Sequence, residues 1–380
     1  MMTTLTTADV AELVDRYGAE GCSDLHLTPH RGVLTVKYKQ TTAVEEIPAL
    51  DPKSIDAFAE SLFQHHLEGG WTPATWQSYA SLDRPRNYRA RVTLKRTVHG
   101  TAAVLRIIPR VVPTRQDLGV MQKVVQLFHR GSGFIGIAGP TGSGKTNTLN
   151  SCLAALMDTV DSHIYMLEDP VEFLHVPKRG LVTQRELGVH FRSYEDGIKD
   201  AKGSHPRVIV IGEIRDGEVA QAALDAALSG HLVVSTLHAN SVEDAIAAMI
   251  AFYPADKQHL ARTQLAQALQ AIVVQSLVRK DGENVSPDEL QMALVQEIAI
   301  NDRELEGTIR GDANGGGALH HVRSYLRSAG RRAGNVPFED SLAHLVRAGK
   351  VTRETAAASL RDPKALTEAL SMPIRTDLEA

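Results

Sequence analysis

The chain has little that would mark a secreted or membrane-spanning protein. It contains two cysteines, Cys22 and Cys152, among 380 residues. Two cysteines cannot build a disulfide framework, so a reducing compartment is the expected setting. No apolar run reaches the length of about 18 residues that a membrane-spanning helix needs. Residues 1–14 (MMTTLTTADVAELV) lack both the basic start and the apolar centre of a signal peptide.

The chain also lacks an excess of either charge and is poor in aromatic residues. Its 41 Lys and Arg residues and 45 Asp and Glu residues give a formal charge of −4, and aromatic residues make up 5%. A basic groove with aromatic side chains, as in proteins that move single-stranded nucleic acid, is therefore not expected. The composition predicts a cytoplasmic protein of two or three domains with no direct nucleic-acid binding.

Two sequence patterns divide the chain. The first region combines alternating apolar and polar residues with helical periodicity, which indicates an α+β domain. Its expected strands lie within 24–38 and 89–108, the latter turning near Gly100, and its expected helices are 8–17 and 53–67. From about residue 117, short apolar strands alternate with longer helical segments, as in βαβ units around a parallel sheet. One of these strands, 163–169, is expected to be followed by a loop.

The predicted fold class is therefore α/β, with a smaller α+β domain in front and short helices at the end. The predicted parts are 1–108, a linker at 109–116, an α/β domain at 117–300, a variable segment at 301–336 and C-terminal helices at 337–380. The variable segment contains GDANGGG at 311–317. So many glycines predict a mobile stretch.

A phosphate-binding loop is the strongest motif in the chain. Residues 139–146 read GPTGSGKT, which matches the complete G-x-x-x-x-G-K-[ST] pattern. An apolar strand leads in and a helical run leads out, so backbone N–H groups and the helix start can face phosphate oxygens. Lys145 is expected to reach the β- and γ-phosphates of ATP, and Thr146 to ligate Mg²⁺. The candidate nucleotide-binding residues are Gly139, Pro140, Thr141, Gly142, Ser143, Gly144, Lys145 and Thr146.

Carboxylates follow two of the apolar strands. Glu213 comes directly after VIVIG, where it can hold Mg²⁺ or polarise the attacking water. The alternative is an acid that complements a helix N-terminus. Glu168 and Asp169 end the strand in MLEDP, and one of them can act as a general base for water. The alternative for both is an ordinary turn after a strand.

Two histidines flank the strand in SGHLVVSTLHAN. His238 follows the strand, where an imidazole can hydrogen-bond a γ-phosphate and respond to its loss. His231 precedes the strand and is the second candidate. A structural histidine is the alternative for each. The spacing does not fit a zinc site, because no cysteine accompanies the pair.

Taken together, GPTGSGKT, LEDPVEFLH, VIVIGEIRD and SGHLVVSTLHAN resemble the Walker A, Asp, Walker B and His boxes of the secretion-superfamily ATPases. TQRELGV before Walker B, SDLHL at 23–27 and the arginines of RARV and LRIIP also resemble that family. The likeness is strongest to PilT-type pilus retraction motors and to the DotB-like and TraJ-like ATPases of type IVB secretion and conjugation. It covers nearly the whole chain.

The resemblance implies a Mg²⁺-dependent ATPase that assembles as a homo-hexamer. It implies a PAS-like domain followed by a RecA-like domain, with nucleotide at subunit contacts. Arg89, Arg91 and Arg106, carried over by position, would then reach toward the phosphates. Without the resemblance, each would be interpreted as a solvated charge on a strand face. The implied partners are inner-membrane platform or secretion-complex proteins, so the protein would associate peripherally with the inner membrane.

The chain departs from the family pattern at two places. His205-Pro206-Arg207 stands where members have Asp-Pro-Asp before the Walker B strand, and AINDRELEGTI at 299–309 matches the AIRNLI-like motif of retraction motors poorly. Pilus retraction, secretion and conjugation therefore all stay open at this point.

Other functions leave different marks in a sequence. A GTPase would need an N-K-x-D guanine motif, which does not occur. A small-molecule kinase would give no reason for the His box. A RecA-like nucleic-acid translocase is the mechanical alternative. A nucleotide-binding regulatory switch is the non-enzymatic one, and the intact Lys145, Thr146, Glu168 and Glu213 argue against it.

Overall fold

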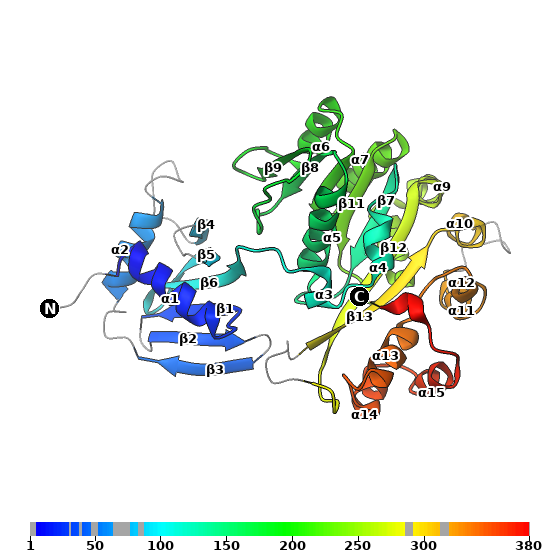
Figure 1. The fold of residues 1–380 in the computed structure, drawn as a ribbon. Coiled ribbons are helices and arrows are strands. Elements are labelled where there is room, and N and C mark those ends of the chain that lie inside the picture. The colour runs from blue at the N-terminus through cyan, green and yellow to red at the C-terminus, as the bar shows by residue number, and fades with distance from the viewer. Residues whose placement is uncertain are drawn as a thin grey trace. The chain divides into compact units, whose positions relative to one another are not determined.

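The computed structural model describes residues 5–29, 32–37, 40–46, 52–63, 77–82, 87–285, 292–311 and 319–379. The chain forms two compact units, one of residues 1–112 with 172–174 and the other of residues 113–171 with 175–380. Each unit has its own sheet (Figure 1). Each also has its own hydrophobic core. The glycine-rich residues after Gly311, predicted to be mobile, lie outside the described residues. No helix in the described ranges is long and apolar enough to cross a membrane.

The first unit is a six-stranded antiparallel sheet in the order β3-β2-β1-β6-β5-β4, covered on one face by two helices. Its elements are α1 (Thr7–Ala19), β1 (Asp24–Thr28), β2 (Gly32–Lys37), β3 (Gln40–Glu45), α2 (Pro52–Phe63), β4 (Gln77–Leu82), β5 (Tyr88–Thr97) and β6 (Gly100–Pro109). Val92 and Leu94 of β5 point to the helices, because side chains alternate along a strand. The predicted hairpin at Gly100 is confirmed. Residues 64–67 of the predicted second helix lie outside the described residues.

The second unit is built on a seven-stranded sheet in the order β13-β12-β7-β11-β10-β8-β9. Its strands are β7 (Gly133–Ala138), β8 (His163–Glu168), β9 (Leu181–Glu186), β10 (Val208–Glu213), β11 (Leu232–Leu237), β12 (Leu269–Arg279) and β13 (Met292–Ile300). All neighbours are parallel except β12 and β13. The predicted parallel-dominated sheet is confirmed. The segment after β8 is not only a loop, because it continues into the edge strand β9.

Helices cover both faces of this sheet, which explains why its strands are almost continuously apolar. Val208 and Val210 of β10 pack with α4 and α5 on one face, and Ile209 and Ile211 pack with α6 to α9 on the other. The helices are α3 (Arg115–Leu118), α4 (Gln122–Leu127), α5 (Lys145–Thr159), α6 (Tyr194–Gly203), α7 (Gly217–Leu228), α8 (Val242–Ala251), α9 (Gln258–Ala268), α10 (Arg303–Arg310), α11 (His321–Arg327), α12 (Ala329–Arg332), α13 (Phe338–Arg347), α14 (Arg353–Ala358) and α15 (Lys364–Ser371).

The predicted C-terminal helices are present as α13 to α15. Leu342 of α13 and Leu366 of α15 pack against Val278 of β12 and Val295 of β13 in a separate apolar cluster. The C-terminal helices thereby attach to the two strands that lie on the far side of β7 from β11. The fold class is thus a small antiparallel domain, a mostly parallel sheet and C-terminal helices.

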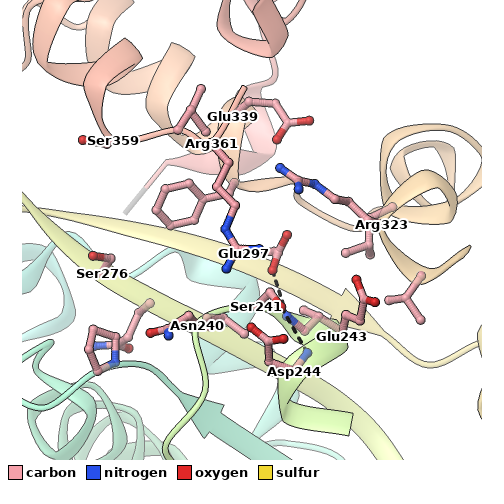
Figure 2. A pocket seen from close by; sticks show the side chains of 18 residues that line it. Asn240, Ser241, Glu243, Asp244, Ser276, Glu297, Arg323, Glu339, Ser359 and Arg361 are labelled. Carbon is pink, nitrogen blue, oxygen red and sulfur yellow. Dashed lines mark hydrogen bonds between the residues drawn. The ribbon is translucent and has the colours of Figure 1, made fainter. Parts of the chain in front are cut away.

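A cavity of about 350 Å³ lies between this sheet and the C-terminal helical segments (Figure 2). Arg323 and Arg361 line it from the helical segments, and Pro140 of the phosphate-binding loop borders it. Glu297 of β13 lines it from the sheet and accepts a hydrogen bond from the backbone N of Val242, the first residue of α8, at 3.0 Å. Burial raises the pKa of Glu297 to about 7, although that hydrogen bond opposes the shift.

We expect the Glu297→Gln substitution to change how stability depends on pH. Between the ordinary pKa of 4.5 and the folded-state value of about 7, the folded protein binds more protons than the unfolded chain. Raising the pH through this window therefore lowers the free energy of unfolding of the wild type. Glutamine keeps an acceptor for Val242 but does not ionise, so the variant should gain stability relative to the wild type as the pH rises. Urea unfolding at several pH values measures this, and parallel pH curves for the two proteins would contradict it.

Candidate nucleotide-binding and catalytic site

The phosphate-binding loop connects β7 to α5. The loop turns sharply because Gly139, Gly142 and Gly144 adopt φ angles of 153°, 78° and 82°, which residues other than glycine rarely adopt. Gly144 caps α5 in the left-handed conformation, and Lys145 is the first residue of the helix. The loop thus presents backbone N–H groups and a helix N-terminus to the same space, which suits a phosphate group.

Close packing against β12 fixes the shape of this loop. A Cβ at Gly139 would lie 2.4 Å from the backbone O of Gln275, so only glycine fits there. The side chain of Gln275 is fully buried, and its Nε2 donates to the carbonyl O of Ser143 at 2.6 Å. Sequence analysis missed Gln275, because its role depends on the pairing of β12 with β7.

Lys145 lies over the loop that carries it. Its Nζ donates to the carbonyl oxygens of Gly139 at 2.8 Å and Pro140 at 3.1 Å. Burial lowers the pKa of Lys145, and the negative charge of Glu213 opposes that shift. Lys145 and Glu213 thus lie close enough for their charges to interact, as a phosphate site with a neighbouring acid requires.

The parallel register brings the candidate residues to one edge of the sheet. Ala138 of β7 pairs with Leu237 of β11, Thr236 pairs with Glu213 of β10, and Ile211 pairs with Leu167 of β8. The carboxyl ends of these strands are therefore level. Glu213 and Glu168 are the last residues of their strands, and the phosphate-binding loop and His238 follow theirs, at the edge where ligands of open α/β sheets bind.

Glu213 is held between a guanidinium and an imidazole. Its Oε2 accepts from Arg215 NH2 at 2.8 Å, and its Oε1 lies 2.9 Å from His238 Nε2. Gly212, just before it, lies where the pairing of β10 with β11 shifts register, and a Cβ there would lie only 3.3 Å from the carbonyl O of Leu167 near the end of β8. The structure thus joins Glu213 and His238, two of the predicted site residues, by a direct contact.

Glu168 is the last residue of β8 and is buried, with 6% of its surface exposed. Its Oε1 accepts from Gln184 Nε2 at 2.9 Å. Asp169, the other candidate base, is exposed. Asp216, near the Walker B strand, has a structural role, because it caps α7 by accepting a hydrogen bond from the backbone N of Val219 at 2.9 Å.

His231 lies at the opposite end of β11 from His238. It precedes Leu232, which pairs with Gly133 at the start of β7, and its Nδ1 is 2.9 Å from the carbonyl O of Pro206. The structure therefore does not bring His231 to the phosphate-binding loop of its own chain. The atypical residues 205–207 also lie at this end, before β10 begins.

The three candidate arginines belong to the first unit. Arg91 of β5 pairs directly with Arg106 of β6, and Arg89 lies two residues before Arg91 on the same face. Arg106 Nε is 3.3 Å from Oδ1 of Asp24, its neighbour on β1. Arg89 is buried, whereas the side chain of Arg106 is 55% exposed. The structure thus gathers three guanidinium groups on the sheet face that the helices do not cover.

Side chains alone do not provide a metal centre. Within the described ranges, no three His, Cys, Asp or Glu side chains form a group that could hold a metal ion. Mg²⁺ usually takes only one or two protein ligands and completes its shell with water and substrate phosphates. The Thr146 hydroxyl at the start of α5 and the Glu213 carboxylate are oxygen donors of the kind that Mg²⁺ prefers. The residues present therefore fit a nucleotide-dependent Mg²⁺ site.

Sequence analysis missed several polar residues around this site. Arg215, Gln184, His175 and Asn150 make the contacts that hold the acids and the start of α5. Arg215 and Gln184 stand inside stretches that resemble the family, GEIRD and TQREL, and this was the only signal for them. His175 ends LEDPVEFLH, another such stretch, whereas Asn150 gave no signal, because only the folded chain brings it to His175.

Comparison with known proteins identifies the family. The model of the type II/IV secretion system protein family matches residues 5–307. The type IV pilus retraction ATPase PilT of Pseudomonas aeruginosa is 29% identical over 94% of this chain and 99% of its own length. The uncharacterized protein YggR of Escherichia coli K12 is 34% identical over 70% of this chain and 77% of its own length.

A solved structure agrees with this result. The crystal structure of the pilus retraction motor PilT with bound ADP superposes with a TM-score of 0.80 and 30% identity, covering 94% of this chain and 99% of that one. The family match and this fold are consistent with the phosphate-binding loop and the acids at one sheet edge. The chain belongs to the type II/IV secretion system protein family and is a secretion-type ATPase that resembles the PilT retraction motors.

Proposed function

We propose that this protein is a motor subunit that hydrolyses ATP with Mg²⁺ to drive a type IV pilus or a type IV secretion machine. One observation carries the proposal: the phosphate-binding loop, Glu213, Glu168 and His238 lie at the level ends of neighbouring parallel strands. This arrangement supplies a phosphate cradle, a metal ligand, a candidate base and a γ-phosphate contact at one place.

Each group has a distinct task in this proposal. The loop and Lys145 hold the β- and γ-phosphates of ATP, and Thr146 and Glu213 hold Mg²⁺, which supplies neutralisation of phosphate charge when bound. Glu168 orients the attacking water and accepts its proton. His238, held against Glu213, contacts the γ-phosphate and transmits its loss to α8, which begins four residues later. His231 stays a prediction without a contact to support it.

We propose further that the chain works as a homo-hexamer. Arg91 and Arg106 stand directly opposite each other, and Asp24 forms an ion pair with Arg106. Neighbouring guanidinium groups favour an anion, and the phosphates of a nucleotide held by a phosphate-binding loop in the ring would be one. A ring of this kind would sit on the cytoplasmic side of the inner membrane and act on platform or secretion-complex proteins.

The type of machine is the finer part of the proposal. The likeness to PilT over nearly the full length of both chains favours pilus retraction. His205-Pro206-Arg207, the main departure, lies at the amino end of β10, away from the acids. It therefore leaves the proposed chemistry intact.

Glu213→Gln should separate ATP binding from hydrolysis. Glutamine keeps the size of the side chain, so a fluorescent ATP analogue should bind nearly as it does to the wild type. Glutamine lacks the negative charge, so turnover should fall by roughly 10²–10⁴. Glu168→Gln should behave similarly, and the double variant should lose less than the product of the two losses, because both groups serve one step.

Steady-state phosphate release and equilibrium binding measure these effects. Glu354→Gln, which alters an exposed acid in the first turn of α14, is the matched control. Wild-type turnover in Glu213→Gln would remove the basis for the ATPase site.

One of Arg89, Arg91 and Arg106 should act on the bound phosphates. Alanine at that position should lower turnover by roughly 10³, the scale of an arginine that stabilises phosphoryl-transfer charge. Circular dichroism should show an unchanged fold. Lys95→Ala is the control, because Lys95 lies on the same strand and face nearer the turn. Normal turnover in all three arginine variants would return them to solvated strand charges.

A further inference from the structure

A chain of hydrogen bonds connects the end of β8 with the first turn of α5. Gln184 Nε2 donates to Glu168 Oε1 at 2.9 Å, and Gln184 Oε1 accepts from the backbone N of His175 at 2.8 Å. The Nε2 atom of the His175 ring lies 2.6 Å from Asn150 Oδ1. Asn150 Nδ2 in turn donates to the carbonyl O of Thr146 at 2.8 Å. The chain thus begins at the candidate base and ends at the candidate Mg²⁺ ligand.

In each of these hydrogen bonds, only one assignment of donor and acceptor is possible. The backbone N–H of His175 can only donate, so Gln184 presents Oε1 to it and its NH₂ group to Glu168. The carbonyl of Thr146 can only accept, so Asn150 turns its NH₂ group there and Oδ1 to His175. The His175 ring must therefore carry a proton on Nε2. Burial lowers the pKa of His175 to about 4, so near neutral pH the ring is neutral and its single proton lies on Nε2.

The edge strand β9 anchors this chain. Gln184 and Glu186 lie two residues apart and therefore on the same face of the strand. Glu186 Oε2 accepts from the backbone N of Val171 at 3.1 Å, and Gln184 accepts from His175 as described above. These two side chains hold the backbone after β8 at two points, so Glu168 cannot shift without breaking hydrogen bonds to β9.

The buried amide of Asn150 adds a free-energy cost to this series of hydrogen bonds. Asn150 is fully buried in α5, where an apolar side chain would pack without needing a partner. Both of its amide atoms have partners, so the cost is offset only while His175 and Thr146 stay in place. A buried series of hydrogen bonds that ends at two site residues indicates that it serves the site.

We propose that Gln184, His175 and Asn150 are positioning residues that fix the Glu168 carboxylate relative to the first turn of α5. This inference rests on the proposed ATPase function of the site. A base acts only when it lies within hydrogen-bond reach of the attacking water, and small displacements cost rate. Breaking the chain therefore impairs hydrolysis more than it impairs nucleotide binding.

The test uses the full-length protein and compares turnover with binding. Gln184→Leu and His175→Leu should each lower kcat by about 10- to 100-fold, as loss of partners that orient a reactive group commonly does. The affinity for a fluorescent ATP analogue should change little. The thermal unfolding midpoint should fall in His175→Leu, because the buried Oδ1 of Asn150 loses its partner. His175→Gln keeps an amide donor toward Asn150 and should recover part of the rate. Thr183→Val is the control, because Thr183 contacts His163 from the other face of β9.

A double-mutant cycle separates positioning from general loss of structure. In a Glu168→Gln background, Gln184→Leu should have little further effect on kcat, because no base remains to be positioned. An equal loss in both backgrounds would overturn the inference, and so would wild-type kcat in Gln184→Leu and His175→Leu. If those variants are normal while Lys145→Ala has lost ATP binding, the ATPase function stands and the inference alone fails. Normal turnover in Lys145→Ala would overturn the function and the inference together.

Discussion

The parallel pairing of β7, β11, β10 and β8 is the constraint on which the site depends. Parallel strands in register end at one edge, so whatever residues follow them come together there. The pairs Ala138–Leu237, Glu213–Thr236 and Ile211–Leu167 make these ends level. Apolar side chains on both faces pack against different helices, so a slip of one residue would place every side chain against the wrong packing partners. The packed core thus positions the site residues, which make few contacts with one another.

Polar contacts then set the finer geometry around that edge. On one side, Gln275 of β12 holds the phosphate-binding loop through Ser143. On the other, β9 holds the backbone after β8, and Gln184 holds Glu168. Two contacts on other strands reach toward α8: His238, just after β11, touches Glu213, and Glu297 of β13 accepts a hydrogen bond from the first residue of α8.

The sequence predicted the parts of the site that depend on local pattern. The phosphate-binding loop, the apolar strands and Glu213 are contiguous in sequence with the elements that position them, so their placement followed from motif and periodicity. His231 shows the limit of that reasoning: it is close to His238 in sequence, yet a strand of six residues separates them by its whole length. Gln184, His175 and Asn150 acquire their contacts only when β9 pairs with β8 and α5 packs beside them. Such long-range pairing leaves no trace in any one segment of the sequence.

The central claim is that this sheet edge binds and hydrolyses ATP with Mg²⁺. The most direct measurement is steady-state phosphate release by the purified wild-type chain, with Mg²⁺ present or chelated and with Lys145→Ala alongside. The account predicts slow, saturable release that requires Mg²⁺ and is abolished in Lys145→Ala, because that variant no longer holds the β- and γ-phosphates. Release that is unchanged by Lys145→Ala, or a folded wild-type protein that neither binds nor hydrolyses ATP, would contradict it.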